Sequence, residues 1–168
     1  MRHLMAGFCL GLSLVTLPAL VRAEPGRWTS GWGQGTSEFF VDDHRGNRLY
    51  ISCDGYENPG RMWVTLNGRS YGFQERYSFD LIINGQRVES PDNAFSRLGS
   101  ALFNQAWDLL RQARTIRVLT HDGKEAGFPV KGVAKALPAR SSKNYHAPDS
   151  DNGIASVTVG RLFRELPL

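Results

Sequence analysis

Apolar and polar residues alternate with a period of two along the first half of the chain. In residues 48–54, Leu49, Ile51 and Cys53 fall on one face, while Tyr50 and polar residues fall on the other. Such alternation is typical of a half-buried β-strand. It predicts strands over residues 37–42, 48–54, 62–67, 71–73, 79–83, 86–88, 115–120 and 128–130, with Asn67-Gly68 and Asn84-Gly85 as hairpin turns.

The apolar period changes to three and four between Ser100 and Ala113. This spacing predicts one amphipathic helix, with Ser96 or Ser100 as its N-cap. A short helix is also expected over residues 132–137, ending at Pro138. We therefore predict an α+β fold in which β predominates: an antiparallel sheet of about six to eight strands, as a sandwich or a partly open barrel, with one main amphipathic helix.

Before the first predicted strand lies the glycine-rich run from Gly31 to Gly35. A phosphate-binding loop of this kind needs a strand before it and a helix after it, which aim backbone N–H groups at the phosphate. Neither element is predicted here. The run is interpreted as a flexible entry to the sheet.

The N-terminus has the order of a secretory signal peptide. A basic start is followed by the uncharged apolar run from Leu4 to Leu20, and Val21 and Ala23 precede the expected cleavage site before Glu24. A retained membrane anchor is the alternative, because 17 residues are at the lower limit of a bilayer-spanning helix. Cleavage removes Cys9 and predicts a protein of the periplasm or the extracellular space, without a transmembrane anchor.

Three segments are expected in the exported chain. Residues 24–138 form a single β-rich domain, residues 139–154 a polar linker, and residues 155–168 a tail that docks on the domain or binds a partner. Loss of Arg2 and Arg22 with the leader leaves 18 basic against 16 acidic residues, a formal charge of +2. No basic run is interleaved with aromatic residues, so a nucleic-acid partner is not expected.

Cys53 is the sharpest candidate for chemistry, because it is the one cysteine left after cleavage. A reactive thiol needs a base that lowers its pKa, and His44 or His121 could supply it. The strand pattern instead places Cys53 on the apolar face as a small buried side chain.

No other catalytic constellation stands out. Asp80 sits alone between apolar strand residues, and His121 and His146 are isolated, without the spacing of metal ligands. The consecutive residues Asp42, Asp43 and His44 are better explained as a turn. We therefore expect no metal, no cofactor and no catalytic residues.

Aromatic residues are more numerous than one small sheet must bury. Tyr50 and Trp63 fall on the polar side of their strands, so they form a binding patch for a protein or glycan unless the main helix covers that face. The expected binding residues are Trp32, Tyr50, Tyr56 and Trp63.

Residues 128–137, FPVKGVAKAL, resemble the close of small bacterial periplasmic domains of the invasion-associated locus B type. The resemblance extends over Leu102 to Leu137. It implies an envelope protein that works by binding and carries over no catalytic residue. The leading hypothesis is a non-enzymatic periplasmic protein, such as an inhibitor, immunity-type protein or accessory factor, whose partner is another envelope or secreted protein. The alternatives are a small cysteine-dependent enzyme and a self-associating structural component.

Overall fold

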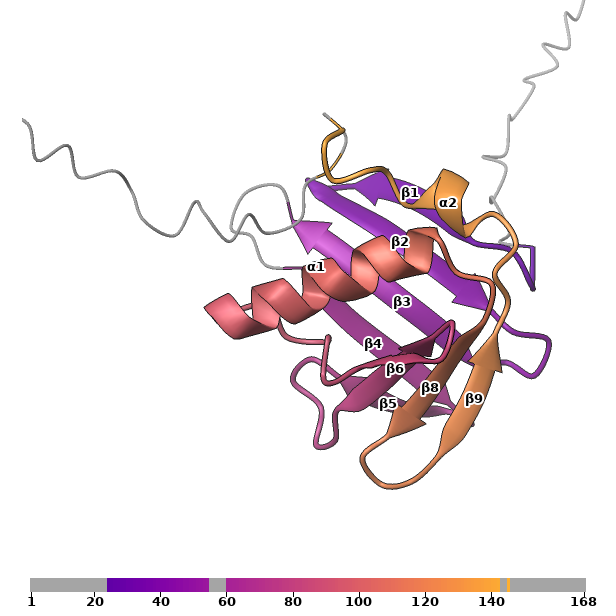
Figure 1. Ribbon diagram of the computed structural model, residues 1–168. Coiled ribbons are helices and arrows are strands. Elements are labelled where there is room, and N and C mark those ends of the chain that lie inside the picture. The colour runs from indigo at the N-terminus through magenta and orange to yellow at the C-terminus, as the bar shows by residue number, and fades with distance from the viewer. Residues whose placement is uncertain (1–23, 55–59, 143–144, 146–168) are drawn as a thin grey trace, which may run out of the picture.

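The computed structural model describes residues 24–54, 60–142 and 145. These residues form nine strands in two antiparallel sheets, with one long and one short helix (Figure 1). The predicted α+β class with β predominant is confirmed. Of the two predicted forms, the barrel is not found in these residues, because both sheets are open.

The first sheet is a meander in which each strand pairs with the next along the chain. Its strands are β1 (Thr29–Gly33), β2 (Thr36–Asp42), β3 (Arg48–Asp54), β4 (Arg61–Leu66) and β5 (Arg69–Gly72). At the β4–β5 turn, Asn67 and Gly68 have φ angles of 51° and 79°. These are the positive values that a tight hairpin turn requires, which explains the Asn-Gly dipeptide.

The second sheet has the order β7-β6-β8-β9, and α1 separates its two hairpins in the sequence. Its strands are β6 (Phe79–Ile83), β7 (Gln86–Val88), β8 (Ile116–Thr120) and β9 (Glu125–Phe128), and the helices are α1 (Arg97–Arg111) and α2 (Val133–Ala136). No helix in the described residues is long and apolar enough to cross a membrane.

Helix α1 and the second sheet pack on the same face of the first sheet (Figure 1). Ser96 caps the helix by accepting a 2.9 Å hydrogen bond from the Gly99 N–H. The helix then buries Phe103 and Trp107, and the Trp107 ring meets Phe39 of β2 edge-on with centroids 5.1 Å apart. One hydrophobic core therefore joins both sheets and the helix.

The ends of the domain are tied to its last elements. The indole N–H of Trp28 donates a 2.9 Å hydrogen bond to the carbonyl oxygen of Pro129, and the Trp28 backbone N–H donates to Lys131. At the other end, the Trp107 indole N–H donates to the carbonyl oxygen of Pro138 over 3.0 Å. These contacts fix the segment after β9 against both the first strand and the long helix.

The structure changes the prediction for the glycine-rich run and decides between the two predicted starts of the helix. The glycine-rich run is not a flexible entry: Gly31 and Gly33 belong to β1, which pairs with β2, and Gly35 turns with a φ of 84°. Of the two predicted N-caps, Ser96 is confirmed, so helix α1 begins at Arg97. The missed strand has a simple cause, because glycines and polar residues give β1 no apolar alternation.

Predictions for the chain ends are only partly covered by the described residues. The leader at residues 1–23 and the tail at residues 155–168 lie outside them. Within the expected linker, Tyr145 packs edge-on against Trp107 with centroids 5.2 Å apart, and its hydroxyl lies 2.5 Å from the side-chain oxygen of Asn104. At this residue, therefore, the segment contacts α1.

Replacing Trp107 by alanine tests the role of the helix in the core. We expect Trp107→Ala to lower the free energy of unfolding by about 3–5 kcal/mol, because it empties a fully buried indole site. Trp32→Ala is the matched control, since Trp32 is 74% exposed and its loss should change stability by about 0.5 kcal/mol or less. Urea denaturation followed by circular dichroism measures both, and equal losses would contradict this account of the core.

Candidate functional site: the aromatic outer face of the first sheet

Tyr50 and Trp63 lie side by side on the outer face of the first sheet. They are directly opposed residues of β3 and β4. Their neighbours Leu49 and Ile51 point inward and are fully buried, so the alternation of the strand turns Tyr50 outward. Since α1 packs on the inner face, the helix does not cover these two side chains, and the question left open by the sequence is answered.

Five aromatic rings form a continuous row across this face, which we call the aromatic stripe. Centroid distances along the row are 6.5 Å from Phe40 to Tyr50, 5.5 Å to Trp63, 5.8 Å to Phe73 and 5.2 Å to Phe95. The stripe runs from β2 across β3 and β4 to the segment before α1. Its last ring is the most open, with Phe95 59% exposed.

Arginines stack on both ends of the aromatic stripe. The Arg48 guanidinium carbon lies 4.8 Å from the Phe40 ring centroid, and that of Arg61 lies 4.9 Å from Phe73 and 5.7 Å from Phe95. A cation over an aromatic face is attracted by the ring quadrupole. The stripe thus offers the half-buried rings of Phe40, Tyr50 and Trp63 and the exposed ring of Phe95, bordered by positive charge, while Phe73 lies buried in the row.

The tyrosine in the middle of the stripe is held by a carboxylate. Tyr50 donates a 2.6 Å hydrogen bond to Glu38. Burial, together with this hydrogen bond and the negative charge of Glu38, raises the pKa of Tyr50. The hydroxyl therefore remains a neutral donor, and the ring orientation is fixed.

The structure brings together only two of the four binding residues predicted from the sequence. Trp32 faces the other way: its opposed residue on β2 is Ser37, which is buried on the inner side beside Phe39. Tyr56 lies outside the described residues. Phe40, Phe73 and Phe95 were missed; the alternation of β2 contains the signal for Phe40, but Phe95 comes from a loop that no sequence period marks.

Cys53 lies in the core, with 1% of its surface exposed. Burial raises the pKa of Cys53 to about 12, so the thiol is protonated at neutral pH. Neither proposed base is beside it, because the His44 ring lies over Gly26 and His121 contacts Asp80. The arrangement is that of a small apolar core residue and does not support an activated nucleophile.

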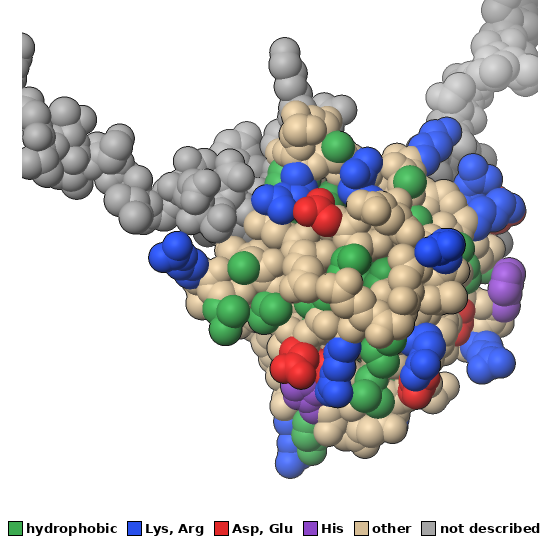
Figure 2. Space-filling model, in the orientation of Figure 1, with side chains coloured by type: hydrophobic (Ala, Val, Ile, Leu, Met, Phe, Trp, Pro, Cys, Tyr) green, Lys and Arg blue, Asp and Glu red, His purple; other side chains and the backbone are tan. Residues whose placement is uncertain are grey.

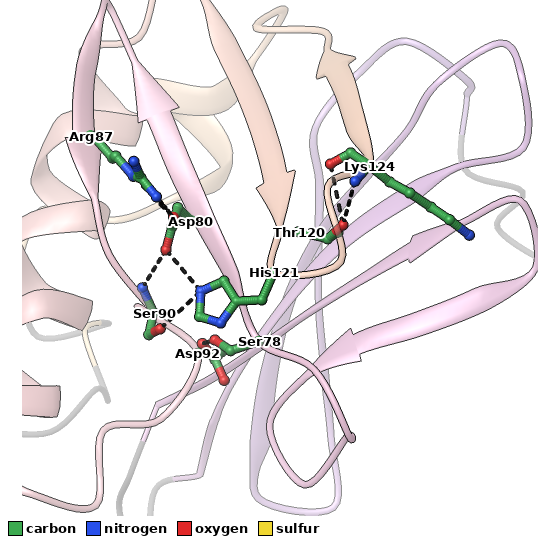
Figure 3. A network of polar contacts seen from close by, with 8 residues as sticks. All are labelled: Ser78, Asp80, Arg87, Ser90, Asp92, Thr120, His121 and Lys124. Atoms are coloured by element: carbon green, nitrogen blue, oxygen red, sulfur yellow. Dashed lines mark hydrogen bonds and ion pairs between the residues drawn. The ribbon is translucent and has the colours of Figure 1, made fainter.

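A polar cluster that the sequence did not predict surrounds Asp80 on the second sheet (Figure 3). Asp80 accepts hydrogen bonds from Arg87, from the Ser90 N–H at 3.0 Å and from His121 Nε2, which lies 3.3 Å away. Burial by itself raises the pKa of Asp80, but these hydrogen bonds outweigh it and hold the pKa below its usual range. Asp80 is therefore an ionised, almost fully buried anchor for three elements.

This cluster contains serine, histidine and aspartate but not the geometry of a catalytic triad. Ser90 Oγ and Asp80 Oδ1 both approach the same nitrogen of His121, at 3.5 Å and 3.3 Å. A triad needs the carboxylate on one ring nitrogen and the hydroxyl on the other, so that the base is oriented while it takes the proton. The neighbouring Asp92 is also committed, because it accepts a hydrogen bond from Ser78.

Among the described residues, no group of three or more histidines, cysteines and carboxylates is placed to hold a metal ion. In the Asp42 to His44 stretch, Asp42 ends strand β2 and the predicted turn follows it. Asp43 accepts from the N–H groups of Arg45 and Asn47 at 2.7 Å and 2.8 Å, which is the pattern of a carboxylate that closes its own loop.

The sequence model of the YfjT family matches residues 26–137. The chain belongs to the YfjT family. A curated member, the uncharacterized protein YfjT of Escherichia coli strain K12, is 28% identical over 128 residues, which cover 69% of this chain and 81% of the relative. No solved structure matches the chain.

The YfjT match has the same limits as the two-sheet core. It begins at Gly26, just before Trp28, and ends at Leu137, just after α2. The aromatic stripe and the Asp80 cluster both lie inside it. The leader and residues 138–168 lie outside it, and the resemblance to the invasion-associated locus B type stays a prediction.

A thiol reagent tests the position of Cys53. We expect the Cys53 thiol to react with a colorimetric disulfide reagent only when the protein is unfolded, with the Cys53→Ala variant as the blank. The same substitution should cost about 1 kcal/mol of stability, because it leaves a small gap in the core. Rapid labelling of the folded protein would contradict a buried, protonated thiol.

The acid side of the stability profile tests the Asp80 cluster. At neutral pH, Asp80→Asn should lower the free energy of unfolding by about 1–3 kcal/mol, since it weakens hydrogen bonds to a charged acceptor. The folded pKa of Asp80 lies below the unfolded value of about 3.9. The contribution of the carboxylate is therefore present above about pH 4 and is lost as the pH falls through the folded pKa, so the two stability curves should converge in acid.

Urea midpoints measured across this pH range give the comparison. Asp108→Asn is the control, because Asp108 makes a 3.0 Å ion pair with Arg140 at the exposed surface. Its effect should stay below about 1 kcal/mol, as for other surface pairs. A gap between wild type and Asp80→Asn that persists undiminished in acid would contradict the role assigned to the carboxylate.

Proposed function

We propose that the protein is an exported, non-enzymatic binding protein of the bacterial envelope, and that its aromatic stripe contacts another envelope or secreted protein. The observation that carries the proposal is the row of aromatic rings on the outer sheet face. Among the described residues, α1 and the second sheet both pack on the opposite face. Except for the buried Phe73, the rings of the stripe are therefore left partly or largely exposed within this part of the chain.

The composition of the stripe matches what protein interfaces use for affinity. Tryptophan, tyrosine and arginine are the residues most enriched among those whose loss weakens binding strongly. Here Trp63, Tyr50 and Arg61 are held in place by neighbours before any partner arrives: the Trp63 indole N–H donates to the Phe73 carbonyl over 2.9 Å. Such pre-arranged side chains lose little conformational entropy on binding.

The opposite side of the molecule contrasts with this face. Figure 2 shows the helix side, where apolar side chains form small separate patches between basic and acidic groups. Small scattered patches are normal for a protein surface, whereas a continuous apolar row marks an interaction site. The contrast favours the stripe over the helix side as the binding surface.

Export follows from the leader pattern. In a bacterium that secretes the full chain through its general export route, we expect a mature protein that begins at Glu24 and lies in the periplasm or the medium. Mass spectrometry of the purified protein measures the N-terminal residue. A protein that keeps Met1 and sediments with membranes would instead show that the apolar run is a retained anchor.

Two glutamate substitutions on opposite faces test the stripe. Phe95→Glu places a charge at its open end, and Trp32→Glu places one on an exposed indole of the other face, so both should preserve the fold. In capture experiments from envelope extract with quantitative mass spectrometry, we expect a protein that wild type and Trp32→Glu retain equally and that Phe95→Glu retains at least tenfold less.

Two outcomes would overturn parts of this proposal. Identical captured sets for all three proteins would show that the stripe is not the interface. Retention of envelope polysaccharide, with no protein that distinguishes the variants, would keep the stripe as a binding surface but change its partner to a glycan. Circular dichroism of each variant verifies that the fold is unchanged.

A further inference from the structure

A second candidate binding surface lies away from the aromatic stripe, where the edge of the second sheet meets the first sheet. An open cleft of about 720 Å³ is lined on one side by Asn67 and by Asp43, His44, Arg45 and Asn47 of the β2–β3 turn, and on the other by residues 114–117 and 125–130. The second wall contains the whole of β9. Because β9 is the last strand in the order β7-β6-β8-β9, the cleft opens onto a sheet edge.

The hydrogen-bond pattern shows which backbone groups face this edge. The backbone N–H of Asn84 donates to Thr115, and that of His121 donates to Ser78. By alternation along the β6–β8 register, Arg117 and Leu119 also direct their backbone groups to β6. On the other side, these two residues oppose Gly127 and Glu125.

Gly127 and Glu125 therefore find no backbone partner in β8. A second contact agrees with this assignment, because the Thr120 N–H donates to the Lys124 carbonyl. Hydrogen-bonded and non-hydrogen-bonded residue pairs alternate along an antiparallel ladder, so every second β8–β9 pair counted from Thr120 and Lys124 is hydrogen-bonded. The N–H and C=O groups of Glu125 and Gly127 point away from β8, toward the free edge of the sheet, and both residues line the cleft. They have the arrangement that another strand needs for pairing.

Within the described part of the chain, β9 is only partly protected as a free edge: it is short and is flanked by Lys124 and Pro129, but no described strand pairs with its outer side. Natural proteins block such edges with lysine, proline, a bulge or a covering element. The strand reads Glu-Ala-Gly-Phe, and a Cβ added at Gly127 would meet only the Ile116 carbonyl, at 3.9 Å. An incoming backbone can therefore approach closely at the middle of the strand.

Positive charge in the cleft exceeds what its acids neutralise. Glu125 is paired with Arg117 at 2.6 Å, and the Asp43 carboxylate is taken up by its own turn. The guanidinium groups of Arg45 and Arg114 form no ion pair with any residue in the described ranges. Two arginines on opposite walls are left to attract an anionic group.

We propose that this cleft binds an extended acidic peptide segment of a partner protein, which pairs with β9 as a fifth strand and places carboxylates against Arg45 and Arg114. Strand addition takes its affinity from backbone hydrogen bonds and its specificity from side-chain contacts at alternate positions. The four residues of β9 offer a pairing length of roughly 13 Å, at about 3.3 Å per residue. Guanidinium groups favour carboxylates because their planar donors match two oxygens.

Charge complementarity argues for an acidic segment as the occupant, because Arg45 and Arg114 line the cleft without an ion pair among the described residues. The proposal does not rest on the aromatic stripe, which lies on the first sheet.

Selection from a random peptide library tests the proposal while the partner is still unidentified. The purified protein is used to select from displayed twelve-residue peptides, and the best ones are synthesised and titrated. We expect peptides rich in β-formers with at least two acidic residues, whose affinity falls as salt is raised. In hydrogen-exchange measurements, binding should protect the Gly127 and Glu125 amides.

Five variants separate backbone pairing from charge and from the stripe. Gly127→Pro removes the outward N–H and should weaken binding at least tenfold, whereas Gly127→Ala keeps the N–H and should bind like wild type. Arg114→Glu should also weaken binding at least tenfold, while Arg97→Glu, on α1 outside the cleft, should not. Phe95→Glu should bind the peptide normally, which separates this site from the stripe.

Three results would overturn the proposal. One is the absence of any selected peptide; another is a set of peptides that binds Gly127→Pro as well as Gly127→Ala. The third is binding to wild type that leaves the Gly127 amide unprotected. The last measurement needs no variant, so it decides the matter even if Gly127→Pro does not fold.

Discussion

The packing of Trp107 and Phe103 against the first sheet is the contact on which the rest of the structure depends. Five strands present one wide apolar face, and the second sheet, built of four shorter strands, does not cover all of it. Helix α1 covers the remainder, because its buried side fits over Phe39 and its neighbours. Since the helix and the second sheet both pack on this inner face, neither of them packs on the side chains of the outer face.

Because α1 and the second sheet cover only the inner face of the first sheet, aromatic residues can occur on both sides of the same strands. Inside, rings fill the core; outside, Tyr50 and Trp63 contact each other, Tyr50 is held by Glu38, and the Trp63 indole N–H is held by the Phe73 carbonyl. Nothing in the inner packing requires an aromatic ring at these outward positions. These outer side chains are thus held in fixed positions, which is the feature on which the proposed binding role rests.

Much of the fold could be predicted because its strands obey a simple period. Leu49, Ile51 and Cys53 mark their inward face, and the Asn-Gly turns mark the hairpins. The period fails where glycine replaces apolar residues, as at Gly31 and Gly33 of β1, so the sequence indicates a loose entry where a strand forms. The candidate site was harder to predict from the sequence. Phe95 joins the stripe from a loop, and Asp80 contacts His121 at the end of a neighbouring strand, so both contacts become visible only in the three-dimensional structure.

The two hydrogen bonds of Trp28 to Pro129 and Lys131 affect when the domain can complete its fold during synthesis. About a hundred residues separate these partners, so the first strand stays without its last support until nearly the whole domain has been synthesised. Contacts that join distant parts of a chain form late, because a large loop must close first. The domain therefore completes its fold only after nearly all of residues 24–138 have been synthesised.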